Sequence, residues 1–233
     1  SIMMALGIVV LAALLAAGGL LNLTDMVLQG QADNGFALIR PPGHHATAGG
    51  YGGSCYLNNA AVAAQAFRDA GAGRVAVIDI DAHHGNGTQS IFYGRDDVWY
   101  GSVHVDPGAG WFPHFLGFAE ETGVGEGIGA TLNIPLPPGA GDDAFVDGVA
   151  ALAEQATAHG AEAVVVSLGV DAEGGDPESP LEVTQDGFSA AGEVLAELAR
   201  SLGTSGAGLP TVLVQEGGYR LDTVGALVAR VLE

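Results

Sequence analysis

The sequence contains no lysine, and its seven basic residues are all arginines set against 27 acidic residues. The formal net charge of −20 gives a surface that repels nucleic acid and anionic lipid and attracts cations. We therefore expect no nucleic-acid partner and no membrane partner. Two explanations of the charge stay open: a polycationic substrate, or an adaptation to high salt, which we favour as the cause of the bulk charge.

The sequence has a single cysteine, Cys55, which excludes a disulfide bond within this sequence and agrees with a reducing compartment. We therefore expect the protein to be cytoplasmic. Nothing around Cys55 suggests a lowered pKa for its thiol, so we expect a buried structural residue rather than a nucleophile.

Charge is also missing from the start of the chain. Residues 2–23 carry no charged side chain and are long enough to imitate a transmembrane segment. The stretch lacks the basic flank of a signal peptide, and the first charged residue, Asp25, is acidic. Its pattern, rich in alanine and glycine, predicts a buried helix instead.

The rest of the chain alternates between strand-like apolar runs and helical patterns. This alternation predicts an α/β fold of three layers (α/β/α), with a mostly parallel sheet between helices on both faces. A length of 233 residues suffices for one large domain, and we treat residues 1–233 as a single domain. Strands are expected at residues 36–39, 75–80, 98–104, 131–134, 163–169 and 211–216, and helices at residues 58–71, 87–93, 142–159, 184–202 and 222–232.

The most informative stretch follows the apolar residues 75–78. Asp81 and His83 alternate there, so on an extended chain both side chains point to one side. One oxygen ligand and one nitrogen ligand suit zinc or a similar divalent ion. Asp171 directly follows another predicted strand and is the expected third ligand. Solvated polar residues at a strand end are the alternative for the first stretch taken alone.

Two further predicted strands end in residues that can carry chemistry. His44 and His45 follow one strand, and Tyr219 stands behind two glycines after the last strand. Open α/β folds bind ligands beyond the carboxyl ends of their strands, so four such ends predict one shared site. Taken alone, the histidines could belong to a turn, and the tyrosine could lie in the core with its hydroxyl bonded.

Together, these motifs resemble the zinc-dependent histone deacetylase and acetylpolyamine amidohydrolase superfamily, which has the arginase-deacetylase fold. The likeness covers nearly the whole chain from about residue 34, and residues 112–123 look most like the bacterial acetylpolyamine amidohydrolases. The superfamily normally has a longer region before this point, so the resemblance implies a catalytic domain that lacks its usual N-terminal portion. The matching stretches are residues 40–46, 55–59, 79–88, 102–104, 125–137, 167–177 and 216–219.

The resemblance implies a metal-dependent hydrolase of linear amides. Asp81, His83 and Asp171 would hold Zn²⁺, with Fe²⁺ as the alternative, and three protein ligands would leave positions open for water and substrate. A structural K⁺ site is implied as well, and its residues would be Asp79, Asp81, His83, Ser102 and Val103.

The family resemblance also assigns the groups that would move protons. His44 would be the general base and His45 the general acid, with Asp79 as the partner of His44 and Asn86 as the partner of His45. Tyr219 would donate its hydroxyl to the developing oxyanion.

The substrate-binding residues implied by the resemblance are Glu178, Phe112, Gly53 and Ser54. In polyamine-selective members of the family, a glutamate that matches Glu178 attracts the distal amine; an ordinary solvated loop residue is the alternative. Ser54 replaces the usual aromatic wall opposite Phe112, so we expect a wider or wetter channel. The expected substrate is a small cationic acetylated amine or an acetyl-lysine, and the resemblance also implies a homodimer.

Three other functions share parts of this pattern. A protein lysine deacetylase would use the same machinery, and a truncated domain could bind without catalysing. A ureohydrolase on the related arginase fold would need a further aspartate two residues after His83, where this chain has Gly85. We therefore do not expect a two-metal site.

Overall fold

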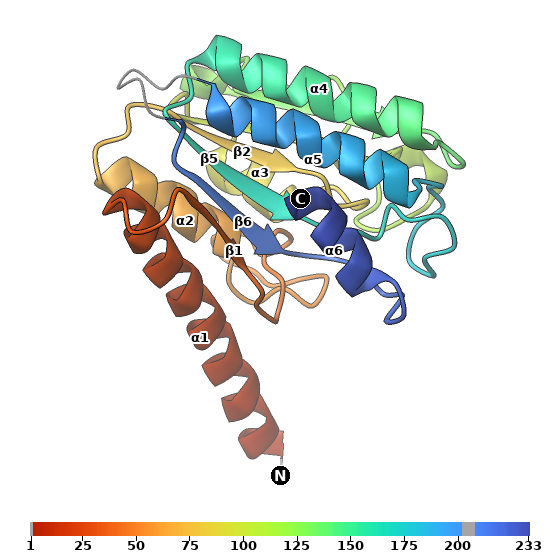
Figure 1. Cartoon of the computed structure of the whole chain (residues 1–233). Helices are drawn as coiled ribbons and strands as arrows, with labels where there is room; N and C mark the ends of the chain where they lie inside the picture. Colours follow the sequence, from red (N-terminus) through yellow and green to blue (C-terminus); the bar gives the residue numbers. More distant parts are fainter. Residues whose placement is uncertain (1, 202–207) are drawn as a thin grey trace.

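The computed structural model describes residues 2–201 and 208–233 (Figure 1). Each predicted strand is present, with its ends shifted by at most two residues. Position 202 of the helix predicted at residues 184–202 lies outside the described residues. Within the described residues, the strands are β1 (Asn34–Ala37), β2 (Val75–Asp79), β3 (Val98–Val105), β4 (Thr131–Leu136), β5 (Ala163–Leu168) and β6 (Thr211–Gln215). The α-helices are α1 (Ile2–Leu28), α2 (Asn59–Asp69), α3 (Asn86–Phe92), α4 (Asp142–His159), α5 (Gln185–Arg200) and α6 (Val224–Leu232), and two short 3₁₀ turns lie at Pro107–Ala109 and Gly125–Gly127.

The strands form one sheet in the order β1-β6-β5-β2-β3-β4, and every pair is parallel. From β1 the chain crosses to β2, adds β3 and β4 on the outer side, and then returns to fill the gap with β5 and β6. The strand order therefore reverses between β5 and β2, where Asp79 is the register partner of Ser167. In open α/β sheets, ligands bind at the carboxyl ends of the strands beside such a reversal.

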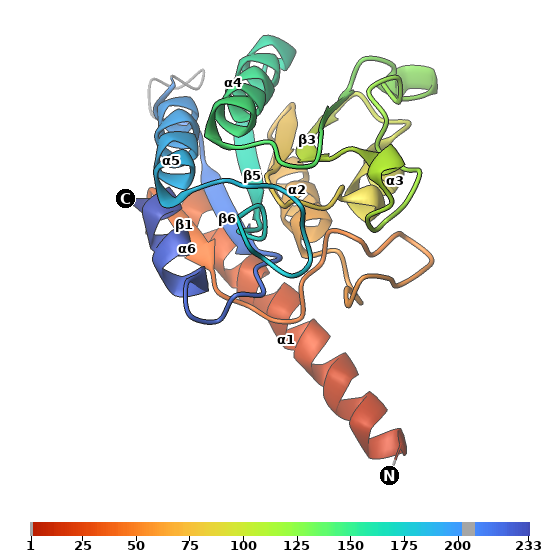
Figure 2. The same cartoon turned by 90° about the vertical axis from the view of Figure 1, so that its right-hand side faces the viewer.

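Helices cover both faces of the sheet, as predicted (Figures 1 and 2). Helices α4, α5 and α6 build one core, in which Phe145 and Phe188 pack with Ile78 of β2. Helices α1, α2 and α3 cover the other face, where Phe67 packs with Val77 of the same strand. Because β2 and β5 are buried on both faces, their sequences are nearly continuous apolar runs.

Asn58 connects the start of α2 to the polar loops at the carboxyl edge of the sheet. Its Oδ1 accepts the Ala61 amide at 2.9 Å and caps the helix, while its Nδ2 donates to the Ala46 carbonyl at 2.9 Å and to Thr88 Oγ1 at 3.1 Å. Nearby Cys55 is fully buried, and burial raises the pKa of its thiol. This agrees with the structural role expected from the sequence.

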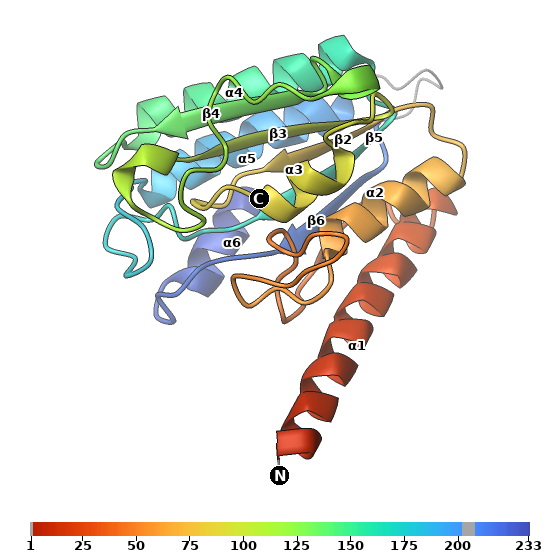
Figure 3. The same ribbon diagram turned by 180° about the vertical axis from the view of Figure 1, so that it is seen from behind.

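Helix α1 corrects the prediction for the start of the chain. The helix is present, but only 28% of its apolar window Gly7–Leu28 is buried. Leu20 packs into the core, whereas Leu14 and Leu15 are more than half exposed. The prediction of a buried helix is wrong for this part because the amino-terminal half extends beyond the sheet (Figures 1 and 3). By length and composition the window could also cross a membrane, a property that core helices and signal sequences share.

Candidate functional site

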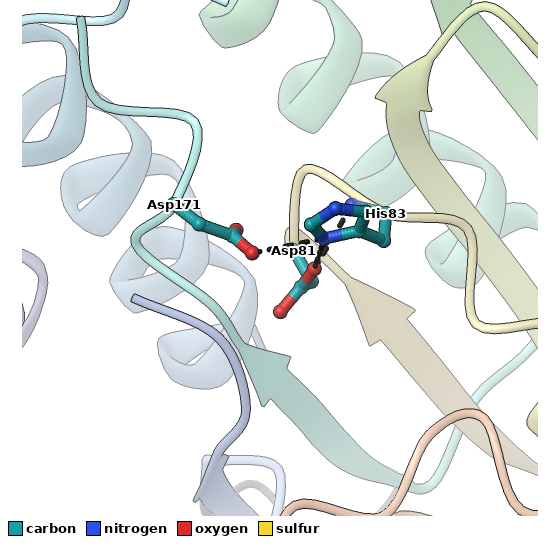
Figure 4. Close-up of side chains that lie close together, drawn as sticks. All are labelled: Asp81, His83 and Asp171. Carbon is teal, nitrogen blue, oxygen red and sulfur yellow. Dashed lines mark hydrogen bonds and ion pairs between the residues drawn. The ribbon is translucent and has the colours of Figure 1, made fainter. Parts of the chain in front are cut away.

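Three buried side chains converge just beyond the carboxyl ends of β2 and β5 (Figure 4). The Nδ1 atom of His83 lies 3.1 Å from Asp81 Oδ1 and 3.0 Å from Asp171 Oδ2. No member of this triad is more than 6% exposed. Carboxylate oxygens and an imidazole nitrogen are ligands of zinc and similar ions. The residues predicted as metal ligands are therefore brought together in an arrangement that could hold a metal ion.

The electrostatics of the triad favour a positive charge between the carboxylates. Burial alone would lower the pKa of His83, but Asp171 and Asp81 outweigh that effect and raise it to about 11. Burial and the neighbouring charge of Asp81 raise the pKa of Asp171 to about 6. A divalent cation at the proton's position would compensate both carboxylates and leave the imidazole neutral as a ligand.

Backbone contacts fix the orientation of the triad. His83 Nε2 donates to the Glu178 carbonyl at 2.9 Å, which leaves Nδ1 facing the carboxylates. Asp81 Oδ2 accepts the Gly217 amide at 2.6 Å. A Cβ at Gly217 would lie 2.2 Å from Asp171 Oδ2, so only glycine allows the β6 loop to come this close.

The position two residues after His83 has no room for a side chain. A Cβ on Gly85 would lie 2.1 Å from Asp79 Oδ2 and 2.6 Å from the Tyr100 hydroxyl. An aspartate for a second metal ion does not fit there, which agrees with the sequence argument against a ureohydrolase site.

The two adjacent histidines lie beside the triad with the predicted partners. Their ring centroids are 3.9 Å apart. His44 Nδ1 donates to Asp79 Oδ2 at 2.9 Å, and His45 Nδ1 donates to Asn86 Oδ1 at 2.8 Å. His44 Nε2 also lies 3.9 Å from Asp81 Oδ1, so the pair borders the metal ligands directly.

The two histidines differ sharply in their electrostatic surroundings. Burial alone would lower the pKa of His44. The carboxylates of Asp79, Asp81 and Glu216 outweigh burial and raise this pKa to about 10. Burial and the neighbouring charge of His44 lower the pKa of His45 well below its usual value. The surroundings therefore favour one charged imidazole beside one neutral imidazole.

Tyr219 lies on the loop after β6, and it is 41% exposed. Its amide donates to Asp176 Oδ2 at 2.9 Å. Burial, together with the charges of Asp81 and Asp171, raises the pKa of its hydroxyl. The phenol therefore keeps its proton and can act as a hydrogen-bond donor.

The residues expected to bind substrate lie around the histidine pair. The Phe112 ring meets the His45 ring edge-on, with centroids 4.7 Å apart. A Cβ on Gly53 would lie 2.3 Å from His45 Cδ2 and 2.9 Å from Phe112 Cε1, so Gly53 packs against both rings. Ser54 and Glu178 are exposed. Phe112 and Gly53 therefore lie against His45, and all four residues are open to solvent, Phe112 with 40% of its surface exposed.

The residues expected to bind a monovalent cation lie at the end of β2, in the segment that follows it, and on the neighbouring β3. Asp79 and Ser102 are register partners, and both are fully buried, as is Val103. Ser102 Oγ lies 2.8 Å from His104 Nδ1. The binding of K⁺ at this place stays a prediction.

Glu216 is a functional candidate that the sequence reasoning missed. It is fully buried, and its Oε2 accepts the amides of Gly43 at 2.7 Å and His44 at 3.2 Å. Arg40 donates to the Glu216 carbonyl at 2.6 Å. Burial raises the pKa of Glu216 to about 7. Like Asp79, it is a carboxylate at the end of a buried strand, and that signal could have identified it.

Comparison with known proteins matches residues 3–233 to the histone deacetylase domain. Acetylpolyamine amidohydrolase from Mycoplana ramosa is 46% identical over 198 residues, which are 85% of this chain and 55% of that protein. The crystal structure of acetylpolyamine aminohydrolase from Burkholderia pseudomallei superposes with a TM-score of 0.84 at 44% identity, over 93% of this chain and 59% of that one. The crystal structure of the HDA15 HD domain superposes with a TM-score of 0.86 at 38% identity, over 95% of this chain and 61% of that one. The chain thus spans just over half the length of these relatives.

Proposed function

The chain belongs to the histone deacetylase domain family, and on this premise we propose that it is a metal-dependent amidohydrolase that removes acetyl groups from polyamines. The proposal rests chiefly on the buried triad of Asp81, His83 and Asp171 beside the histidine pair. Relatives named acetylpolyamine amidohydrolases support this substrate class. A cytoplasmic location and a homodimer are parts of the same proposal.

The triad would hold Zn²⁺, with Fe²⁺ as the alternative. When bound, the ion would supply a Lewis acid that activates water and polarises the acetyl carbonyl. K⁺ near Asp79 and Ser102 would be structural.

The protein's own residues move the protons. His45 donates from Nδ1 to the neutral Asn86, so a neutral imidazole keeps its lone pair on Nε2 and accepts a proton from the attacking water. His44, bonded to the Asp79 carboxylate, is stabilised as the imidazolium and donates a proton to the leaving amine. This assignment exchanges the roles expected from the sequence, where His44 is the general base and His45 the general acid, and it is supported by the partners of the two rings, a carboxylate for His44 and a neutral amide for His45.

Tyr219 and the residues around it orient the substrate. The Tyr219 hydroxyl donates to the developing oxyanion. Phe112 and Gly53 flank the methylene stem near His45, while Ser54 leaves the outer channel wide. The Glu178 carboxylate and the net charge of −20 attract the distal ammonium of the substrate.

A protein lysine deacetylase is the second candidate. The overall likeness to the HDA15 HD domain favours it, and the same proton-transfer groups would serve. Binding without catalysis is the third candidate, since the chain spans 55% of a curated relative.

Acetate release after metal removal and return of Zn²⁺ tests the proposal. We expect zinc-dependent release, faster from N-acetylputrescine than from an acetyl-lysine peptide. N-butylacetamide is the matched neutral control, because it has the same stem without the distal amine. Glu178→Gln is expected to raise KM for N-acetylputrescine and leave KM for N-butylacetamide unchanged. No release by folded protein that binds zinc would refute the amidohydrolase proposal.

A further inference from the structure

The loop that follows Asp171 contains a second buried carboxylate, Asp176, which is 5% exposed. Both of its oxygens accept backbone amides: Oδ1 from Glu178 at 2.9 Å and Oδ2 from Tyr219 at 2.9 Å. The two amides belong to segments 43 positions apart along the chain, counted from Asp176 to Tyr219. One carboxylate therefore joins the loop after β5 to the loop after β6.

The first of these contacts leads directly to a metal-ligand candidate. The Glu178 amide is held by Asp176, and the carbonyl of the same residue accepts His83 Nε2 at 2.9 Å. That bond directs His83 Nδ1 toward the carboxylates of Asp81 and Asp171. A partner on the outer nitrogen of a metal-binding histidine fixes its tautomer and ring orientation.

The second contact leads to the oxyanion donor. Tyr219 follows Gly217 and Gly218 in an irregular loop, and the residue is 41% exposed, so packing alone restrains it weakly. The amide bond to the Asp176 carboxylate is charge-assisted and fixes the backbone from which the phenol projects.

We infer that Asp176 is a positioning residue that sets the orientation of the metal ligand His83 and the placement of Tyr219 together. This inference rests on the proposed function for its effect on turnover. It extends that function by naming a residue that touches neither metal nor substrate and acts through two others.

The alternative is that Asp176 only stabilises the loops, and the chain offers a matched control for it. Thr223 Oγ1 donates to Glu173 Oε2 at 2.6 Å and ties the same two loops together away from Tyr219 and Glu178. Thr223→Val removes this one bond between the loops, while the 3.1 Å bond from Arg220 Nη1 to Glu173 Oε1 and both amide contacts of Asp176 stay in place. If loop stability were the whole role, any loss of kcat or Zn²⁺ affinity would follow the loss of stability in the same proportion in Thr223→Val and in substitutions of Asp176.

Asp176→Asn is the test variant, because it keeps the size of the side chain and replaces one acceptor oxygen with a donor. We expect kcat to fall about 10- to 100-fold with KM nearly unchanged, and Zn²⁺ affinity to fall about 10-fold. Zinc affinity is measured by competition with a chromogenic chelator, which requires no catalysis. Thr223→Val is expected to keep kcat and Zn²⁺ affinity within about 2-fold of the wild type, since it touches neither contact.

A double-mutant cycle separates the effect of Asp176 on His83 from its effect on Tyr219. If Asp176 acts on turnover through the phenol, Asp176→Asn added to Tyr219→Phe costs less kcat than it costs alone, while its effect on Zn²⁺ affinity stays the same. Full additivity in kcat would contradict the effect on Tyr219. An unchanged zinc affinity in Asp176→Asn would contradict the effect on His83.

Amide hydrogen exchange in the wild-type protein tests the inference even if Asp176→Asn does not melt cooperatively. The Glu178 and Tyr219 amides are expected to be protected relative to neighbouring loop amides. Unprotected exchange of both amides would overturn the inference. Equal losses of kcat and Zn²⁺ affinity in Thr223→Val and Asp176→Asn would overturn it as well. If the wild type binds Zn²⁺ but releases no acetate, the proposed function fails, while zinc affinity and exchange still decide the role of Asp176.

Discussion

Helix α1 carries no charged side chain over residues 2–23, yet its Leu14 and Leu15 are more than half exposed. The carboxyl edge of the sheet shows the opposite arrangement, in which ionisable side chains are buried: Asp79, Asp171 and Glu216 have no exposed surface. Burying ionisable groups is costly unless they are paired, hydrogen-bonded or bound to a metal ion. Buried charge, rather than apolar character, therefore marks the candidate functional site of this molecule.

Asp171→Ala should give the largest effect at the buried edge. It removes one of three ligands, so zinc binding should be lost and acetate release should fall by more than about 1,000-fold, beyond the 10- to 100-fold cost of losing an outer partner. Acetate release and zinc competition measure the two effects. The exposed Asp222, changed to alanine, is the control and should behave like the wild type. Zinc-dependent turnover by Asp171→Ala would contradict the assignment.

Substitutions in the histidine pair test the same buried edge, because the activities of the two variants should depend differently on the leaving group of the substrate. His44→Ala and His45→Ala should each slow amide hydrolysis about 10²- to 10⁴-fold. With p-nitrophenyl acetate, whose leaving group departs without a proton, His44→Ala should recover much of its activity and His45→Ala should not. Recovery by His45→Ala instead would restore the roles expected from the sequence.

Two leucines of α1 divide that helix into a part that stabilises the fold and a part that does not. Leu20 is fully buried, so Leu20→Ala should lower the free energy of unfolding by about 2–5 kcal/mol. Leu15 is 67% exposed, so Leu15→Ala should change it by less than about 0.5 kcal/mol. Urea unfolding monitored by circular dichroism measures both. Equal losses would mean that the exposed part of α1 is covered in solution.

The pH dependence of stability tests a buried histidine behind the site. Burial lowers the pKa of His104 from 6.5 to about 4, so between these values the unfolded chain binds the proton more tightly. The stabilisation is therefore complete above about pH 6.5 and is lost as the pH falls to about 4, by at most about 3 kcal/mol.

The measurement is urea unfolding with chelator present at pH 7 and pH 4.5, on the wild type and on His104→Gln. The difference between the two proteins isolates His104 from Glu216, whose raised pKa acts in the opposite direction. A wild type that loses no more stability than His104→Gln would show that the shift is absent.

A pair of glycines compares the two regions by the sign of the effect. Gly85→Ala forces a Cβ to within 2.1 Å of Asp79 Oδ2, and such overpacking should cost about 1–3 kcal/mol of stability. Gly18 lies inside α1, and a methyl group added there would meet nothing within 4 Å, so Gly18→Ala should raise stability by about 0.5–1 kcal/mol. Thermal melts compare the two. Opposite signs support the contrast between the regions, and a loss in both would contradict it.

The sequence predicts the strands and the metal-ligand triad well because both depend on local pattern. Buried parallel strands are nearly continuous apolar runs, and the residues at their carboxyl ends meet at one edge of the sheet. The pairing of His44 with Asp79 and of His45 with Asn86 was also expected, from the family resemblance, and the structure has both pairs.

Features that depend on distant neighbours could not be predicted in the same way. The burial of α1 depends on which elements reach it, and the helix pattern alone does not contain that information. Glu216 contacts Gly43 across 173 positions, and the Asp176 contact to Tyr219 spans 43 positions. The electrostatic surroundings of His44 likewise depend on the charges of Asp79, Asp81 and Glu216, which only the assembled site brings together.

In the proposed function, the triad of Asp81, His83 and Asp171 holds the ion on which amide hydrolysis depends. The most direct test is a crystal structure of the protein with Zn²⁺, with anomalous data collected on both sides of the zinc absorption edge. We expect one strong peak about 2.0–2.2 Å from His83 Nδ1 and from one oxygen of each aspartate. A strong peak elsewhere with none at the triad, in protein that releases acetate with zinc, would contradict it.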